Sequence, residues 1–155
     1  FVPVPYYATP APQTNVLNTT ALLVFSGLYT FADVNSNGIS DAWEQQFFGE
    51  VSANRTQFTD SDADGMSDYA EFIAGTIPTN VNSSLQLTPT LLTNQSLLVA
   101  WPSSVDRAYQ LHSSSNAVNW SATSGWIVAT NTNSSMTLPP LTNGAPYLFR
   151  LQVRP

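Results

Sequence analysis

The sequence predicts a mainly β protein, in which a small module with two short helices precedes an antiparallel β-sandwich. Two observations carry this prediction. A twelve-residue pattern rich in Asp and Asn occupies positions 33–44 and recurs 27 positions later, at 60–71, and each copy runs into a short helix-forming segment. From residue 85 onward, short apolar segments alternate with polar turn residues, which is typical of antiparallel strands.

The composition excludes several classes of protein. With 43% hydrophobic residues the chain can bury a core, although only 9% of its residues are charged. Four arginines and no lysine form no basic patch, so we expect neither nucleic acid nor an anionic membrane as a partner. The absence of cysteine excludes disulfides, and the absence of lysine excludes Lys–Asn isopeptide crosslinks. No apolar run reaches the roughly 18–20 residues of a membrane span.

Three parts are expected along the chain. Residues 1–14 are rich in proline and form an extended N-terminal arm. Residues 15–80 hold a β-segment and the module with the two repeats, and residues 81–155 form the sandwich. The chain starts with Phe1, which fits either a mature form left after removal of a signal peptide or a trimmed chain.

The second part contains the expected helices. Positions 16–32 predict two short apolar strands around a Ser26-Gly27 turn, with a helix as the alternative. The helices follow as DAWEQQFF from residue 41 and DYAEFIA from residue 68. Each is flanked by a serine where an N-cap is expected and a glycine at the C′ position: Ser40 and Gly49, then Ser67 and Gly75.

The third part predicts six short strands. Their sequences are LQLT, SLLVAW, AYQLHS, GWIVAT, SMTL and PYLFRLQV. This is an antiparallel sandwich in about 70 residues, fewer than the roughly 100 of an immunoglobulin-like domain. If the final strand is the sixth of such a sandwich, the seventh is missing and one edge of the sheet is open.

The two repeats match the calcium-loop pattern D-x-[DN]-x-[DN]-G-x5-E. Calcium takes six to eight oxygens, and the pattern supplies carboxylate or amide oxygens, one backbone carbonyl and a bidentate glutamate. Eight of the ten acidic residues lie in the two windows, so the net charge of −6 is concentrated there. The expected ligands of two Ca²⁺ sites are Asp33, Asn35, Asn37, Ile39, Asp41 and Glu44 in the first loop, and Asp60, Asp62, Asp64, Met66, Asp68 and Glu71 in the second.

The alternative is a pair of Asp/Asn turns that cap two helices. Two full matches that also hold most of the acidic charge favour calcium, and magnesium fits less well because it requires a tight octahedron. The loops predict structural sites, because the fifteen residues between Glu44 and Asp60 leave no room for the second helix of a sensor. With five acidic residues against three, the second loop is expected to bind more tightly.

The stretch from DAWEQQFFG through DSDADGMSDYAEFIAGTIPTN to YLFRLQVRP resembles the C-terminal region of large secreted bacterial surface proteins. In these proteins, EF-hand-like loops of thrombospondin type 3 or dockerin style precede a fibronectin-III-like sandwich. The resemblance covers about residues 33–155 and implies an extracellular, calcium-stabilised, non-enzymatic protein with a fibronectin-III/immunoglobulin-like β-sandwich lacking its last strand. The chain departs from the pattern at Asn35, Asn37 and Ile77, where aspartate is commoner.

The sequence offers two further candidate sites, one at the only histidine and one at three tryptophans. His112 is the only histidine and Asp106 lies nearby in sequence, but no G-x-S-x-G elbow accompanies them, so a structural histidine is the better interpretation. Trp101, Trp120 and Trp126 could stack on sugars, although a core or edge role is commoner in sandwiches.

The arm suggests how copies could assemble. In FVPVPYY, Val2, Val4 and Tyr6 share one face, while Pro3 and Pro5 remove donors on the other side, so the segment could pair along one edge only. Donated to the open edge of another copy, it would build a homopolymer. A proline-rich linker is the equal alternative. We therefore expect a calcium-stabilised extracellular filament or surface-appendage subunit, or alternatively a passive calcium-binding adhesion or carbohydrate-binding module of a larger secreted protein that contacts surface glycans.

Overall fold

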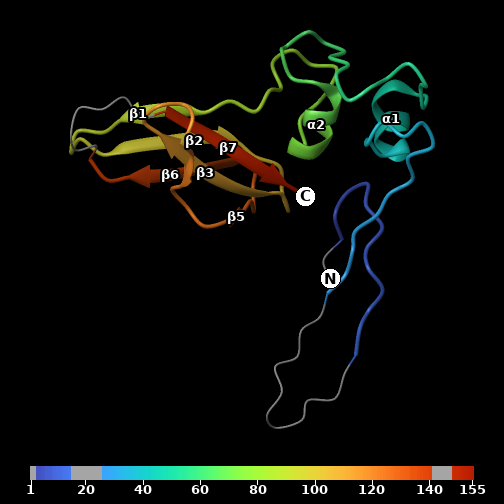
Figure 1. Cartoon of the computed structure of the whole chain (residues 1–155), viewed down its shortest axis with the longest axis horizontal. Coiled ribbons are helices and arrows are strands. Elements are labelled where there is room, and N and C mark those ends of the chain that lie inside the picture. The colour runs from blue at the N-terminus through green and yellow to red at the C-terminus, as the bar shows by residue number, and fades with distance from the viewer. Residues whose placement is uncertain (1–2, 15–25, 141–147) are drawn as a thin grey trace. The chain divides into compact units, whose positions relative to one another are not determined.

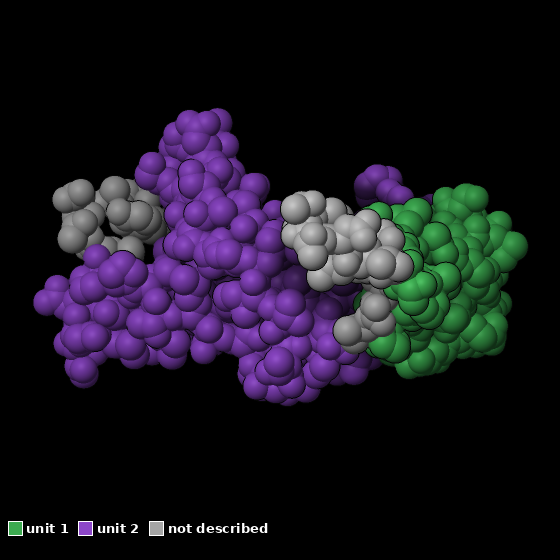
Figure 2. Space-filling model, turned by 90° about the horizontal axis from the view of Figure 1, so that it is seen from below, with its two compact units in different colours: residues 1–55 green, residues 56–155 purple. Residues whose placement is uncertain are grey.

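The structure is a computed structural model that describes three stretches of the chain: residues 3–14, 26–140 and 148–155 (Figure 1). The chain divides into two compact units, residues 1–55 and residues 56–155 (Figure 2). The division falls between the two repeats. The second repeat therefore belongs to the same unit as the sandwich, whereas the sequence pattern grouped both repeats in one module.

The arm belongs to the first unit and is not extended throughout. Tyr7 N donates to Val4 O at 3.1 Å and closes a turn, which differs from the extended arm predicted from the sequence. Tyr6, inside this turn, donates its hydroxyl to Gln46 Oε1 at 3.0 Å, a contact that sequence pattern does not reveal. Beyond the turn, Ala8 forms one isolated antiparallel bridge with Thr30. Most of the strand pair expected over 16–32 lies outside the described residues, and Gly27–Tyr29 form no strand.

Helix α1 (Asp41–Phe48) confirms the first expected helix. It ends at Gly49, whose φ of 74° is left-handed, as the C′ position requires. Ser40 occupies the N-cap position, but its side chain makes no capping hydrogen bond, and its backbone carbonyl accepts the first helical amides instead. Trp43 is fully buried and its ring centroid lies 5.0 Å from that of Phe47.

Helix α2 (Asp68–Ala74) opens the second unit and confirms the second expected helix. Here the expected cap is present, because Ser67 Oγ accepts from Ala70 N at 3.3 Å. The helix ends at Gly75, with a left-handed φ of 79°.

Two antiparallel sheets follow and confirm the sandwich (Figure 1). The first sheet has the order β1-β2-β6, with strands β1 (Thr88–Leu91), β2 (Leu97–Pro102) and β6 (Asn133–Leu138). In the second sheet, β3 pairs with all the other strands, namely β4 (Ser121–Ala122), β5 (Ile127–Val128) and β7 (Leu148–Arg154). Because β4 and β5 pair with opposite ends of β3, they share one of its edges, and β7 takes the other.

The core lies between the sheets and follows the period of two along the strands. One cluster joins Val99, Leu111 and Leu138, and a second joins Trp101, Tyr109 and Ala129. Each cluster draws residues from both sheets, so burial of these side chains holds the two layers together. Trp101 thus fills the core, as the sequence indicated.

The strand ends differ from the sequence pattern at two places. Leu85 and Leu87 pack against the core as their alternation predicted, but the first strand begins only at Thr88, and Pro89 within it is tolerated because this is an edge strand. The expected strand GWIVAT is reduced to the two residues of β5.

Within the described residues, strand β7 pairs on one side only. All seven of its residues pair with β3, and no residue in the described stretches pairs with its other side. The sequence predicted six strands with this one last, whereas the structure describes seven, because it also contains the two-residue β4, and β7 is the seventh. Helix α2 lies close to β7.

Helix α2 is joined to the sandwich by its carboxyl end. Two carbonyls of its last turn accept hydrogen bonds from the sandwich: Arg107 Nη2, just before β3, donates to Phe72 O at 3.1 Å, and Tyr109 Oη, on β3, donates to Ala74 O at 3.3 Å. A Cβ on Gly75 would lie 2.6 Å from Ser104 Cβ. The second repeat is therefore attached to the sandwich through a tight contact.

This contact gives the first testable prediction. Gly75→Ala should lower the free energy of unfolding by about 2–5 kcal/mol, because it adds an overpacked contact to the left-handed strain. Gly49→Ala is the matched control, since Gly49 has a similar φ but open space around it, and should cost only about 1–2 kcal/mol. Urea denaturation measures both. Equal losses for the two variants would show that the contact with Ser104 is not tight.

Candidate metal centre

The two repeats fold into the same loop, which we call loop 1 (residues 33–44) and loop 2 (residues 60–71). The first aspartate of each accepts the amide of the sixth residue: Gly38 N donates to Asp33 Oδ2 at 2.9 Å, and Gly65 N to Asp60 Oδ2 at 3.0 Å. Two further bonds repeat in the same register, Ile39 N to Asn37 Oδ1 with Met66 N to Asp64 Oδ1, and Val34 N to Asp41 Oδ1 with Ser61 N to Asp68 Oδ1.

The sixth position needs glycine in both loops. Gly38 and Gly65 have φ values of 82° and 94°, a region that costs other residues strain. Glycine there turns the chain sharply enough for the first aspartate to reach the amide. The glycine of the D-x-[DN]-x-[DN]-G-x5-E pattern stands at this turn in both loops.

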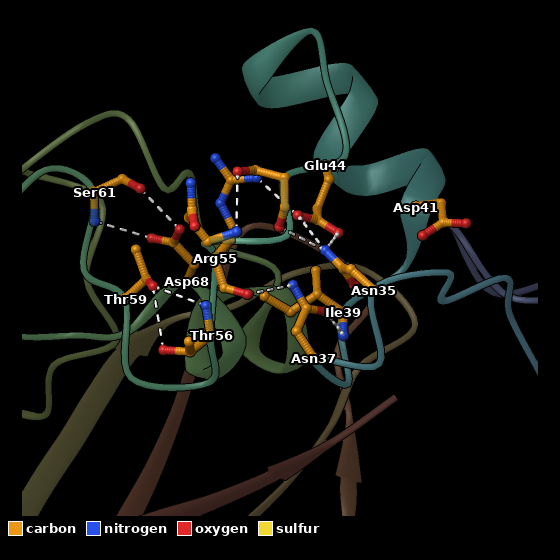
Figure 3. A network of polar contacts seen from close by, with 12 residues as sticks. Asn35, Asn37, Ile39, Asp41, Glu44, Arg55, Thr56, Thr59, Ser61 and Asp68 are labelled. Carbon is orange, nitrogen blue, oxygen red and sulfur yellow. Dashed lines mark hydrogen bonds and ion pairs between the residues drawn. The ribbon is translucent and has the colours of Figure 1, made fainter.

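Loop 2 gathers carboxylates around one point. Asp60, Asp62 and Asp64 each place an oxygen within 4.8 Å of the others, close enough to share a metal ion. Oδ2 of Asp62 and Oδ2 of Asp64 are buried and have no hydrogen-bond partner. Asp68 is fully buried and accepts from the backbone amide and the hydroxyl of Ser61, at 3.0 and 2.8 Å (Figure 3).

Glu71, at the twelfth position of loop 2, has no exposed surface. Its Oε1 accepts from Thr76 Oγ1 at 3.1 Å, while its Oε2 is buried without a partner. Burial raises the pKa of Glu71 to about 7, and the carboxylates of Asp62, Asp64 and Asp68 add to the rise. Leaving such a carboxylate ionised costs free energy, which a cation would offset.

This arrangement fits a metal ion. Three of the unpartnered buried oxygens belong to the third, fifth and twelfth positions of loop 2, all of which supply ligands in the calcium-loop pattern, and a fourth, Asn35 Oδ1, lies at the third position of loop 1. A buried polar atom without a partner is rare in folded proteins and calls for an explanation. A cation held by Asp60, Asp62 and Asp64 would satisfy two of these atoms, and Glu71 is not part of that group of three.

Loop 1 has the same backbone but different side-chain partners. Among the residues that the structure describes, no three His, Cys, Asp or Glu side chains come within metal-binding distance of one another there. Glu44 is fully buried, and Arg55 Nη1 donates to its Oε1 at 2.7 Å (Figure 3). Asn35 Nδ2 donates to both Glu44 oxygens, at 3.3 and 3.1 Å. The expected ligands of loop 1 are thus near one another, yet positive charge from the chain itself already contacts the glutamate.

Sequence reasoning did not find the residues that contact the two glutamates. Arg55 is the sole basic residue between positions 33 and 71, and this isolated positive charge within an acidic stretch is the signal that could have identified it. Thr76 carried no signal, because a threonine just after a helix is common. Arg107 and Tyr109, which bind the end of α2, were assigned to the sandwich alone.

The other candidate residues have structural contacts. His112 Nε2 lies 3.2 Å from Gln110 Oε1 on the same strand rather than beside a carboxylate. Arg150 and Arg154 stack over the rings of Trp120 and Trp126, at 4.6 and 4.0 Å from the ring centroids. One face of each tryptophan is therefore in contact with a guanidinium.

None of the described helices is long and apolar enough to span a bilayer. Comparisons with models of protein families, with curated proteins and with solved structures found no match to this chain. The resemblance to secreted bacterial surface proteins stays a prediction, and the function is argued from the loops themselves.

Glu71 gives a prediction for the protein in chelator. Its carboxyl binds a proton more readily in the folded state (pKa about 7) than at its ordinary value of 4.5, so stability falls as pH rises through this window. Glu71→Gln removes the buried charge and should stabilise the chelated protein at pH 8, by up to about 3 kcal/mol. The gain should shrink as pH falls toward 4.5. Thermal unfolding at several pH values measures it, and a gain that does not change with pH would contradict the burial of an ionised Glu71.

Proposed function

We propose that this protein is a calcium-stabilised structural protein of the extracellular space, in which a Ca²⁺ ion at loop 2 stabilises the β-sandwich. The observation that carries the proposal is the set of buried, unpartnered oxygens on Asp62, Asp64 and Glu71. These oxygens need a positive partner that the described contacts do not supply.

Calcium is the cation that the donors of loop 2 favour. All of the side-chain donors are oxygens, which suits a hard cation rather than zinc or copper. Magnesium prefers a tight octahedron and keeps much of its water. The residues that would hold the ion are Asp60, Asp62, Asp64, the Met66 carbonyl, Asp68 and Glu71. The ion would supply two positive charges to five carboxylates.

The role of the ion follows from where Glu71 lies. It belongs to α2, whose last carbonyls accept hydrogen bonds from Arg107 and Tyr109 of the sandwich. An ion that fixes Glu71 to the loop also fixes this helix. Binding would thus stabilise the contact between α2 and the strands, which is a structural effect and requires no moving helix pair. A non-enzymatic role is part of the proposal, as is an extracellular location, where calcium modules of modest affinity are commonly used.

Calcium should raise the melting temperature of the protein, and chelation should lower it. The variant Glu71→Gln distinguishes a calcium site at loop 2 from the alternative, in which the repeats are Asp/Asn turns that cap helices and bind no ion. The variant should be more stable than the wild type in chelator at pH 8, but less stable in saturating calcium, because it loses a carboxylate ligand. Differential scanning calorimetry in both conditions measures the reversal.

Glu50→Gln is the control for this reversal, because Glu50 is an exposed acidic residue outside both loops. It should change stability little in either condition. A wild-type protein that takes up no calcium in titration calorimetry, or that melts at the same temperature with and without chelator, would refute the proposal.

Assembly by strand addition is a second candidate function, favoured by the one-sided pairing of β7. An unpaired strand edge can accept another strand through its backbone groups. The arm of a second copy is the occupant that the sequence suggests. To donate it, a copy would have to open the turn closed by Val4 and Tyr7 and break the bridge between Ala8 and Thr30. The filament thus requires a rearranged arm.

Deleting residues 1–12 should abolish filaments but leave calcium uptake unchanged, if the arm is the donor. Val4→Asp should also block assembly, because it would place a charge in an apolar groove of the neighbouring copy. Electron microscopy and light scattering measure both effects.

Thr9→Asp is the control for this experiment, because Thr9 is exposed near the end of the arm, and it should assemble as the full chain does. A truncated protein that assembles equally well would show that the arm is not the donor. In that case a monomeric adhesion or carbohydrate-binding module becomes the better proposal. Sugar stacking itself has less support, since Trp101 is buried and Trp120 and Trp126 each carry an arginine on one face.

A further inference from the structure

The turn over residues 52–55 binds loop 1 at three of its ligand positions. At the third position, Asn35 Nδ2 donates to Ser52 O at 2.9 Å. At the fifth, Asn37 Nδ2 donates to Arg55 O at 3.3 Å. At the twelfth, Glu44 accepts from Arg55 Nη1 at 2.7 Å. The turn itself is closed by Arg55 N, which donates to Ser52 O at 3.1 Å. One short segment thus contacts the loop where an ion would be held.

The charge of Glu44 is balanced in this arrangement. Its carboxylate has no exposed surface, and the side chain of Arg55 is only 10% exposed. The guanidinium also lies 3.6 Å from the ring centroid of Phe48, which fixes its plane. A buried carboxylate with a charged hydrogen-bond partner and two contacts from Asn35 has the partners that burial requires.

The two asparagines are explained by the same contacts. Asn35 and Asn37 stand where loop 2 has Asp62 and Asp64. An aspartate has no N–H group, so it could not donate to the carbonyls of Ser52 and Arg55. Asn35 must also turn its nitrogen toward Glu44, because the carboxylate is an acceptor. With the nitrogen in that direction, Asn35 Oδ1 is left buried without a hydrogen-bond partner, and an ion at loop 1 would need this oxygen to face Glu44 instead.

The second repeat has no arginine at the position equivalent to Arg55. The residue 27 positions after Arg55 is Asn82, which is uncharged. In loop 2, Glu71 contacts Thr76 and keeps one buried oxygen without a partner. The two loops share a backbone but differ in what balances the glutamate.

We propose that Arg55 takes the electrostatic role of the ion in loop 1, so that the protein binds one Ca²⁺ ion, at loop 2, and loop 1 folds without metal. This rests on the proposed function for loop 2 and replaces the expectation of two calcium sites. The first loop is then a rigid calcium-independent element, and only the unit that contains the sandwich responds to calcium.

Titration calorimetry with calcium chloride tests the proposal on three forms of the full chain. The wild type should bind one ion, and Glu71→Gln should bind none or bind at least tenfold more weakly. The third form combines Glu71→Gln with Asn35→Asp, Asn37→Asp and Arg55→Gln, which gives loop 1 the donors of loop 2 and removes its arginine. This form should regain one ion.

The outcomes separate this inference from the proposed function. If the wild type binds two ions and Glu71→Gln binds one, the inference that loop 1 folds without metal is wrong, whereas the proposed calcium site at loop 2 is unaffected. No uptake by the wild type would refute the proposed function. Hydrogen exchange of the wild type tests the inference even if the multiple variant fails to fold. The amides of α1 should be equally protected in calcium and in chelator. A loss of α1 protection in chelator would overturn the inference.

Discussion

Each loop of this protein buries a glutamate completely, and a carboxylate in such a place needs a cationic or hydrogen-bonding partner, or a proton. Glu44 and Glu71 both lie at the twelfth position, in the first turn of a helix, and neither has exposed surface. An ionised carboxylate in such a place is tolerated only with charged or hydrogen-bonding partners. At Glu44 the partner is Arg55, and at Glu71 one oxygen has none. The fold of both loops depends on how this single requirement is met.

Helix α2 carries Glu71 and connects loop 2 to the sandwich. The helix is only seven residues long and would not be stable alone, since isolated helices of this length are marginal in water. Its ends are fixed from outside, by the acidic loop at the start and by Arg107 and Tyr109 at the finish. Because Tyr109 also belongs to the core with Trp101, a change in charge at Glu71 is linked through one short helix to the packing of the two sheets.

The acidic and basic residues of the chain lie mostly in different parts of it. Nine of the ten acidic residues lie between Asp33 and Glu71, and Asp106 is the exception. Three of the four arginines lie in the sandwich, and two of these stack on tryptophans of the second sheet. The acidic residues are thus concentrated in and between the two loops, and the basic residues in the sandwich.

The sequence by itself determined the elements that depend on local geometry. The glycines of the loops and helix ends, the two helices and the alternating strands were all predictable, because φ preferences and side-chain periods act over a few residues. Only the tertiary structure decided which oxygens are left without partners. Arg55 reaches Glu44 from eleven positions away, and Arg107 reaches Phe72 from thirty-five, across turns whose course no local pattern records. Two loops with one motif therefore differ in charge balance because long-range contacts, rather than the motif, place the positive partner.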